Sequence, residues 1–90
     1  VGRPEKPIKR VAWCTGGAQG FFQDAIDAGV DAYITGEISE AQYHLANETD
    51  VAFISAGHHA TERYGVQALA SAIETEFGIA YQFFDEANPA

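Results

Sequence analysis

The sequence predicts an α/β fold in which a mostly parallel sheet of about four strands alternates with three helices, in the order βαβαβαβ. One five-residue pattern occurs three times with even spacing, at Ala12–Gly16, Ala32–Gly36 and Ala52–Ala56. Its successive positions hold an alanine, an aromatic residue, an apolar residue, a residue with a hydroxyl group and a small residue. Each copy is followed by a segment with helical periodicity. Alternating strands and helices favour a parallel sheet with helices packed against it.

Two helices are expected between the repeats. The first covers residues 21–28, where apolar side chains share one face and Gly29 ends the helix. The second begins at Ser39, which forms an S-x-x-Q capping box with Gln42.

The third helix has the clearest amphipathic pattern. It is expected over residues 61–77, and Gly78 is a typical helix stop. A final strand over residues 79–84 is expected to complete the sheet.

Length and composition indicate one small globular domain. Of the 90 residues, 47% are hydrophobic and 20% are charged, which is typical of an ordered chain. We expect residues 1–7 to be a linker, residues 8–86 to be the α/β domain and residues 87–90 to be a tail. The chain begins at Val1 and contains no methionine, so we expect it to be a processed chain or a piece of a longer protein.

The charge distribution excludes some classes of partner. The net charge is −8, and four of the five basic residues lie in the first ten positions. Such an acidic body would repel phosphate backbones, so we expect no nucleic-acid binding. No apolar run reaches the roughly 20 residues that a membrane helix needs. A single cysteine excludes an internal disulfide and fits a cytoplasmic location.

The carboxyl ends of parallel strands meet at one edge of a sheet, where ligands bind. Three loops should gather there, over residues 15–20, 36–39 and 57–61. The reactive side chains expected near one another are Cys14, Thr15, Glu37, His58, His59 and Glu62.

His58 and Glu62 form a candidate metal-binding pair. They are four residues apart at the end of the third predicted strand, which allows both to reach one ion. Imidazole nitrogen with carboxylate oxygen suits zinc, iron, manganese or nickel better than calcium. The alternative is a turn-capping histidine beside a solvated glutamate. His59 is expected to point away from its neighbour, in a structural or supporting hydrogen bond.

Other candidates have structural alternatives. The glycine-rich turn over residues 16–20 resembles a phosphate-binding loop but lacks the Walker lysine, so a tight turn is an equal interpretation. Glu37 can position a water or a ligand histidine, or simply favour a helix N-terminus. We expect His44 to be packed or solvent-facing and Cys14 to be a buried strand residue. Three aromatic residues at equivalent repeat positions are expected in the core: Trp13, Tyr33 and Phe53.

Three segments together resemble the C-terminal part of the Nif-three-like family, closest to its bacterial branch. They are Val11–Gly17, Asp31–Glu37 and Ala56–Arg63, in that order. The likeness covers nearly all of the chain after the linker, and Gly-His-x-x-x-Glu after a strand is its most specific part. Members are commonly named GTP cyclohydrolase one type two, or dinuclear metal-binding proteins of uncertain function.

The resemblance implies a C-terminal half that supplies part of a two-metal site. A histidine pair and an aspartate would come from the missing N-terminal half, with His58 and Glu62 as the metal ligands of this chain. Two divalent ions would then bind per intact protein. Glu37 and Thr15 match family turns near the site and are candidates for lining it. The family also implies a ring-like homo-oligomer, commonly a hexamer.

The resemblance implies a metal-dependent hydrolase. The family name also implies hydrolysis of the GTP cyclohydrolase type. A water between two metals would attack a small-molecule or nucleotide substrate. This chain alone, with half of the ligands, is expected to be inactive. Two alternatives stay open: a non-catalytic module that binds a nucleotide or phosphate, and an assembly protein whose metal joins its subunits.

Overall fold

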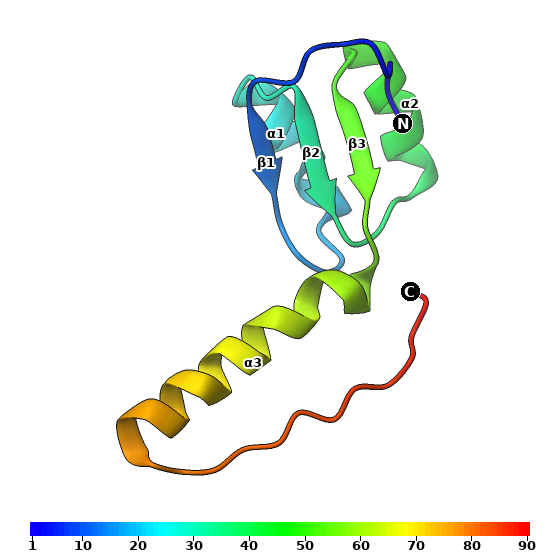
Figure 1. Cartoon of the computed structure of the whole chain (residues 1–90). Coiled ribbons are helices and arrows are strands. Elements are labelled where there is room, and N and C mark those ends of the chain that lie inside the picture. Colours follow the sequence, from blue (N-terminus) through cyan, green and yellow to red (C-terminus); the bar gives the residue numbers. More distant parts are fainter.

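Three parallel strands form one sheet in the computed structural model, which describes all 90 residues (Figure 1). They are β1 (Val11–Trp13), β2 (Ala32–Thr35) and β3 (Ala52–Ser55), hydrogen-bonded in the order β1-β2-β3. A helix lies in each crossover, because parallel neighbours need a long connection. The prediction of an α/β fold with a parallel sheet and three helices is therefore confirmed.

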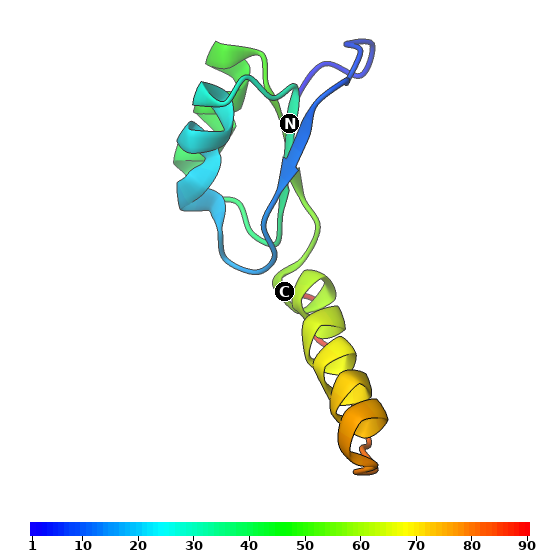
Figure 2. The same ribbon diagram turned by 90° about the vertical axis from the view of Figure 1, so that its left-hand side faces the viewer.

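Two of the helices cover one face of the sheet. A 3-10 turn, η1 (Gln19–Phe21), leads into α1 (Phe22–Asp27), and α2 (Glu40–Thr49) follows β2. Figure 2 shows α1 and α2 on the same side of the sheet, while no helix covers the opposite side. None of the helices has the length and apolar character needed to cross a membrane.

The core lies between the sheet and these two helices. The ring of Phe22 meets that of Phe53 edge-on at 4.9 Å, and Tyr33 lies 5.7 Å from each of them. The small side chains of Ala25 in α1 and Ala46 in α2 allow both helices to pack closely against this aromatic cluster. The buried hydrophobic cluster consists of Phe22, Ala25, Val30, Tyr33, Ala46, Val51 and Phe53.

Trp13 does not belong to this core, and the prediction that it does is wrong. β2 and β3 pair in the register of the sequence repeat, with Tyr33 beside Phe53. In β1, however, Ala12 pairs with Tyr33 and Trp13 pairs with Ile34, a shift of one residue. Because side chains alternate between faces, that shift turns Trp13 to the opposite side. Its exposed fraction is 74%, against 2% for Tyr33 and 1% for Phe53.

The third helix, α3 (His58–Phe77), starts at the carboxyl end of β3 and leads away from the sheet (Figure 1). It begins three residues earlier than the predicted start at Thr61. Gly78 ends it in the left-handed region, at φ 65°, as predicted. Its 20 residues span about 30 Å.

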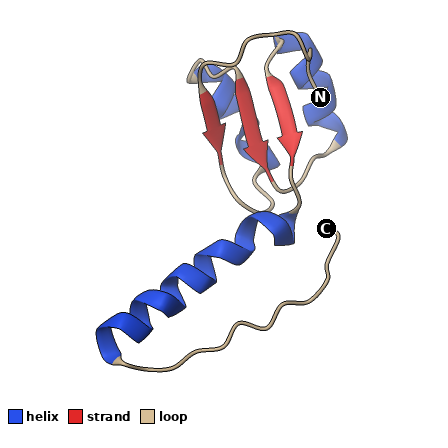
Figure 3. Ribbon diagram, in the orientation of Figure 1, coloured by secondary structure: helices blue, strands red, loops and turns tan.

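The predicted final strand over residues 79–84 is absent. These residues belong to an extended loop that runs back from the end of α3, drawn in tan in Figure 3. They lie alongside α3 instead of beside a strand, and Arg63 of α3 lies over the ring of Phe83 at 5.6 Å. The radius of gyration is 16.2 Å, whereas a compact chain of this length has about 12 Å.

The capping box predicted for α2 does not form, although the helix does start directly after Ser39. The Ser39 side chain caps no backbone N–H. Its backbone oxygen accepts a hydrogen bond from Gln42 N at 3.1 Å, and its hydroxyl lies 3.4 Å from Gln19 Nε2. The Ser39 hydroxyl group therefore accepts a hydrogen bond from Gln19 of η1 instead of one from the backbone of α2.

The N-terminal residues lie along the outer edge of β3. Val1 and Phe53 exchange two backbone hydrogen bonds, of 2.8 and 2.9 Å. Arg3 and Lys6 both form ion pairs with Asp50, at the end of α2. The division into linker, domain and tail stays a prediction.

Candidate metal centre

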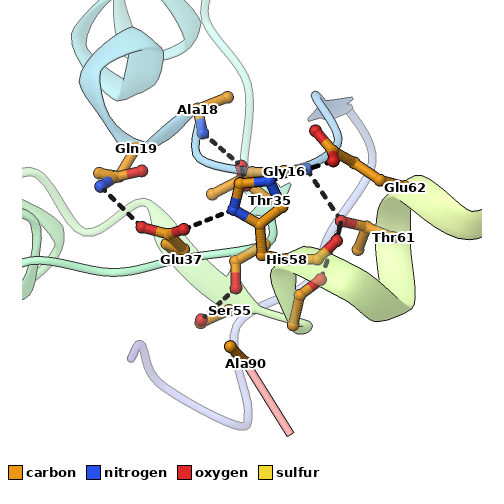
Figure 4. A network of polar contacts seen from close by, with 12 residues as sticks. Gly16, Ala18, Gln19, Thr35, Glu37, Ser55, His58, Thr61, Glu62 and Ala90 are labelled. Carbon is orange, nitrogen blue, oxygen red and sulfur yellow. Dashed lines mark hydrogen bonds and ion pairs between the residues drawn. The ribbon is translucent and has the colours of Figure 1, made fainter. Parts of the chain in front are cut away.

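Backbone hydrogen bonds join the three loops at the carboxyl edge of the sheet. Gly36 N donates to Gly16 O at 2.8 Å, and Gly57 N donates to Gly36 O at 3.0 Å. The loops after β1, β2 and β3 are thus linked in the order of the strands. This arrangement brings the first turn of α3 next to the loops from β1 and β2 (Figure 4).

His58 lies in that first turn, between two carboxylates. Its Nε2 is 3.1 Å from Oε2 of Glu62, one helical turn further along α3. Its Nδ1 is 2.5 Å from Oε1 of Glu37, which follows β2 (Figure 4). The structure therefore brings together three of the residues that the sequence singled out.

Hydrogen bonding sets the electrostatics of this group. The hydrogen bond to Glu37 raises the pKa of His58 above its ordinary value, and the nearby charge of Glu62 acts in the same direction, against partial desolvation. The same hydrogen bond lowers the pKa of the Glu37 carboxyl group. In many metal-binding histidines a carboxylate bonded to one ring nitrogen leaves the other nitrogen to face the metal. Here Glu37 is bonded to Nδ1, and Nε2 faces Glu62.

Two threonine hydroxyl groups that the sequence reasoning did not identify hold the loops in place. Thr61 accepts a hydrogen bond from Gly16 N at 2.9 Å and donates to Gly57 O at 2.8 Å. Thr35 is fully buried, and it donates to Gly16 O at 3.1 Å and accepts from Ala18 N at 3.3 Å. The hydroxyl position of the sequence repeat was the available signal for Thr35.

Gly36 permits the close approach of α3 to the sheet edge. A Cβ atom at this position would lie 2.5 Å from Gly16 O and 2.7 Å from the Cα atom of His58. Both obstacles are backbone atoms, so no side-chain rotation would relieve them. Any larger residue would move His58 relative to Glu37.

The remaining candidates lie outside this group. Thr15 and Cys14 line a separate cavity. Cys14 is exposed, so the prediction that it is buried is wrong; it follows the last residue of the short strand β1. His59 points to Asp85, with 3.3 Å between Nε2 and Oδ1. His44 is exposed on α2, where Glu40 lies 3.9 Å away.

Two backbone N–H groups of the turn over residues 16–20 are bonded inside the fold. Gly16 N donates to Thr61, and Ala18 N donates to Thr35. A phosphate-binding loop directs such groups at its ligand. The geometry therefore favours the interpretation as a tight turn.

The donor set fits part of a metal site. Two atoms that each lie about 2.1 Å from one metal ion, at roughly a right angle, are about 3 Å apart. The 3.1 Å between His58 Nε2 and Glu62 Oε2 matches that separation. No group of three or more histidine, cysteine, aspartate or glutamate side chains is arranged to hold a metal ion. A complete site would need ligands from elsewhere.

Comparisons with known proteins identify the family. The family model described as Duf34/NIF3 (NGG1p interacting factor 3) matches residues 1–89. The chain belongs to this family. The Duf34/NIF3 assignment confirms the resemblance seen in the sequence motifs.

The relatives carry the same descriptive name. A Neisseria meningitidis serogroup A protein, named GTP cyclohydrolase 1 type 2 homolog, is 72% identical over all of this chain, which is 36% of that relative. A Pseudomonas aeruginosa protein of the same name is 60% identical over 94% of this chain and 34% of its own length. The chain spans about a third of the length of these curated relatives.

Two solved structures contain a part that is similar to this chain. The structure of protein ybgI, described as of unknown function, matches with a TM-score of 0.89 and 49% identity, over 92% of this chain and 34% of that chain. A hypothetical protein of Staphylococcus aureus, SA1388, matches with a TM-score of 0.72 and 26% identity, over 89% of this chain and 24% of its own.

Proposed function

We propose that His58 and Glu62 are ligands of a divalent metal site that the rest of a longer polypeptide completes. The 3.1 Å separation of His58 Nε2 and Glu62 Oε2 carries the proposal, because it places both donor atoms within reach of one ion. Zinc, iron, manganese and nickel all suit this donor pair. Glu37 would act as the positioning residue, since its carboxylate holds Nδ1 at 2.5 Å and so orients the ring.

The proposed reaction is hydrolysis of a small molecule, and a purine nucleotide is the leading candidate. A pair of divalent ions would supply Lewis-acid chemistry and lower the pKa of an attacking water. The relatives' name, GTP cyclohydrolase 1 type 2 homolog, supports the nucleotide class. A cavity of about 600 Å³ adjoins His58, Glu62 and Arg63, and its volume lies within the range of small-molecule sites. Arg63 also lines this cavity, and its guanidinium group is ion-paired with Asp85 at 2.9 Å.

Metal analysis of a full-length protein tests the ligand proposal. We would replace the matching third of the Neisseria meningitidis relative with this chain and measure metal content by mass spectrometry. His58→Ala and Glu62→Gln are each expected to deplete the bound metal. His44→Ala and Glu74→Gln are matched controls, on α2 and on the distant part of α3, and should leave the metal content unchanged.

Either of two results would refute the proposal. One is wild-type metal content in both site variants. The other is equal depletion of metal in folded site variants and folded controls, because the metal content would then not depend on His58 and Glu62 in particular. A screen of nucleotide hydrolysis becomes informative only after the metal result is positive.

A further inference from the structure

One face of the sheet has no covering layer in this chain. The register places Val11, Trp13, Ile34 and Ile54 on this face, opposite α1 and α2 (Figure 2). We call these residues, together with Tyr64 at the start of α3, the open face. Trp13 is 74% exposed, Tyr64 68% and Ile54 42%.

The composition of the strands is that of a sheet buried on both sides. No residue of β1, β2 or β3 is charged. Solvent-facing strands usually alternate apolar and polar residues, whereas the strands of parallel sheets are covered on both faces and read as apolar runs. All three strands here are parallel. The open face is therefore built to be covered.

A hollow marks where the covering layer would fit. A cavity of about 340 Å³ lies between the open face and the first turns of α3. Most of its lining is apolar. The residues that line it are Trp13, Cys14, Thr15, Ile34, Ala56, Ala60, Thr61 and Tyr64.

We infer that the open face is the docking surface for the polypeptide that the longer relatives carry beyond the matched third. This chain covers 36% of the Neisseria meningitidis relative, so nearly twice as much chain again is available there to supply the layer. The docked segment presents an apolar side to Trp13 and Ile54, as an amphipathic helix on a parallel sheet does.

The open face also lies beside the candidate metal centre. Thr61 lines its cavity, and its hydroxyl group is bonded to Gly16 N at 2.9 Å. His58 and Glu62 lie three residues before and one residue after Thr61 on α3. A segment docked on the open face would therefore come close to the proposed ligands. The docking inference itself rests on the sheet and holds whether or not a metal binds.

Hydroxyl-radical footprinting with mass spectrometry tests the inference on single residues. Trp13 and Tyr64 are compared in the 90-residue chain and in the full-length chimaera described above. We expect both to react in the short chain and to lose most of that reactivity in the chimaera. Tyr43, which is 54% exposed on α2, is the internal control and should react equally in both proteins.

Substitution gives a second measurement. Trp13→Ser should lower the melting temperature of the chimaera but not that of the 90-residue chain, in which the side chain is exposed. Tyr43→Ser should change neither by a comparable amount. Undiminished reactivity of Trp13 in the chimaera would overturn the inference. So would concentration-dependent protection of Trp13 in the 90-residue chain alone, because a second copy would then be the occupant. Neither readout depends on metal content.

Discussion

Gly36→Ala is expected to destabilise the chain by about 2–4 kcal/mol, by forcing α3 away from the sheet edge. The backbone at Gly36 does not have a positive φ, so alanine meets no conformational penalty there. The new Cβ atom would lie 2.5 Å from Gly16 O and 2.7 Å from the Cα atom of His58. Reaching the 3.4 Å limit of ordinary contact requires shifts of roughly 0.9 and 0.7 Å.

Those shifts act on the hydrogen bonds that join the loops. Gly36 N is bonded to Gly16 O at 2.8 Å, and Gly36 O accepts from Gly57 N at 3.0 Å. Overpacking typically costs about 1–3 kcal/mol, and the loss of one of these bonds adds about 1 kcal/mol. The free energy of unfolding is measured by urea titration followed by circular dichroism.

Gly65→Ala is the matched control, because nothing lies within 4 Å of a Cβ atom at that position in α3. Alanine in place of a helical glycine should stabilise the chain by up to about 1 kcal/mol. If Gly36→Ala left the free energy of unfolding within about 0.5 kcal/mol of wild type, the close approach would not be limiting and the reasoning would be refuted.

Three further predictions concern buried polar groups, the metal centre and pH. Thr35→Val removes the hydroxyl that serves two backbone groups of the loop after β1 and should cost about 1–3 kcal/mol in urea unfolding; an unchanged midpoint would contradict it. Glu37→Gln in the chimaera should weaken metal binding by about 10–100-fold in a chelator competition, because the ligand histidine loses its orienting carboxylate; equal affinity would exclude that role. Asp31 accepts two backbone N–H groups at 2.9 Å, which lowers its pKa in the folded state. Its stabilising contribution is therefore present at neutral pH and is lost as the pH falls below about 4 and through the folded pKa. The difference in the free energy of unfolding between wild type and Asp31→Asn should shrink over that pH range. A constant difference would contradict the assignment.

Local sequence signals determined the elements and the edge at which the site lies. The repeated apolar runs identified three parallel strands, and the amphipathic pattern with Gly78 identified the long helix and its end. Because parallel strands end at one edge, the sequence also predicted that Glu37, His58 and Glu62 would lie close together. These features follow from side-chain periodicity and chain order, which are both local or topological properties.

Tertiary structure alone decided the register of β1, the direction of α3 and the loop contacts around Gly36. The sequence repeat suggested that Trp13 was equivalent to Tyr33, yet pairing with Ile34 turned it to the open face. Residues 79–84 have the composition of a strand, but they run back alongside α3, where Arg63 lies over the ring of Phe83 at 5.6 Å, and pair with no strand. Strand register and helix direction depend on contacts between residues far apart in the chain. An apolar pattern indicates that a side chain will be buried, but it does not indicate which residues will pack against it.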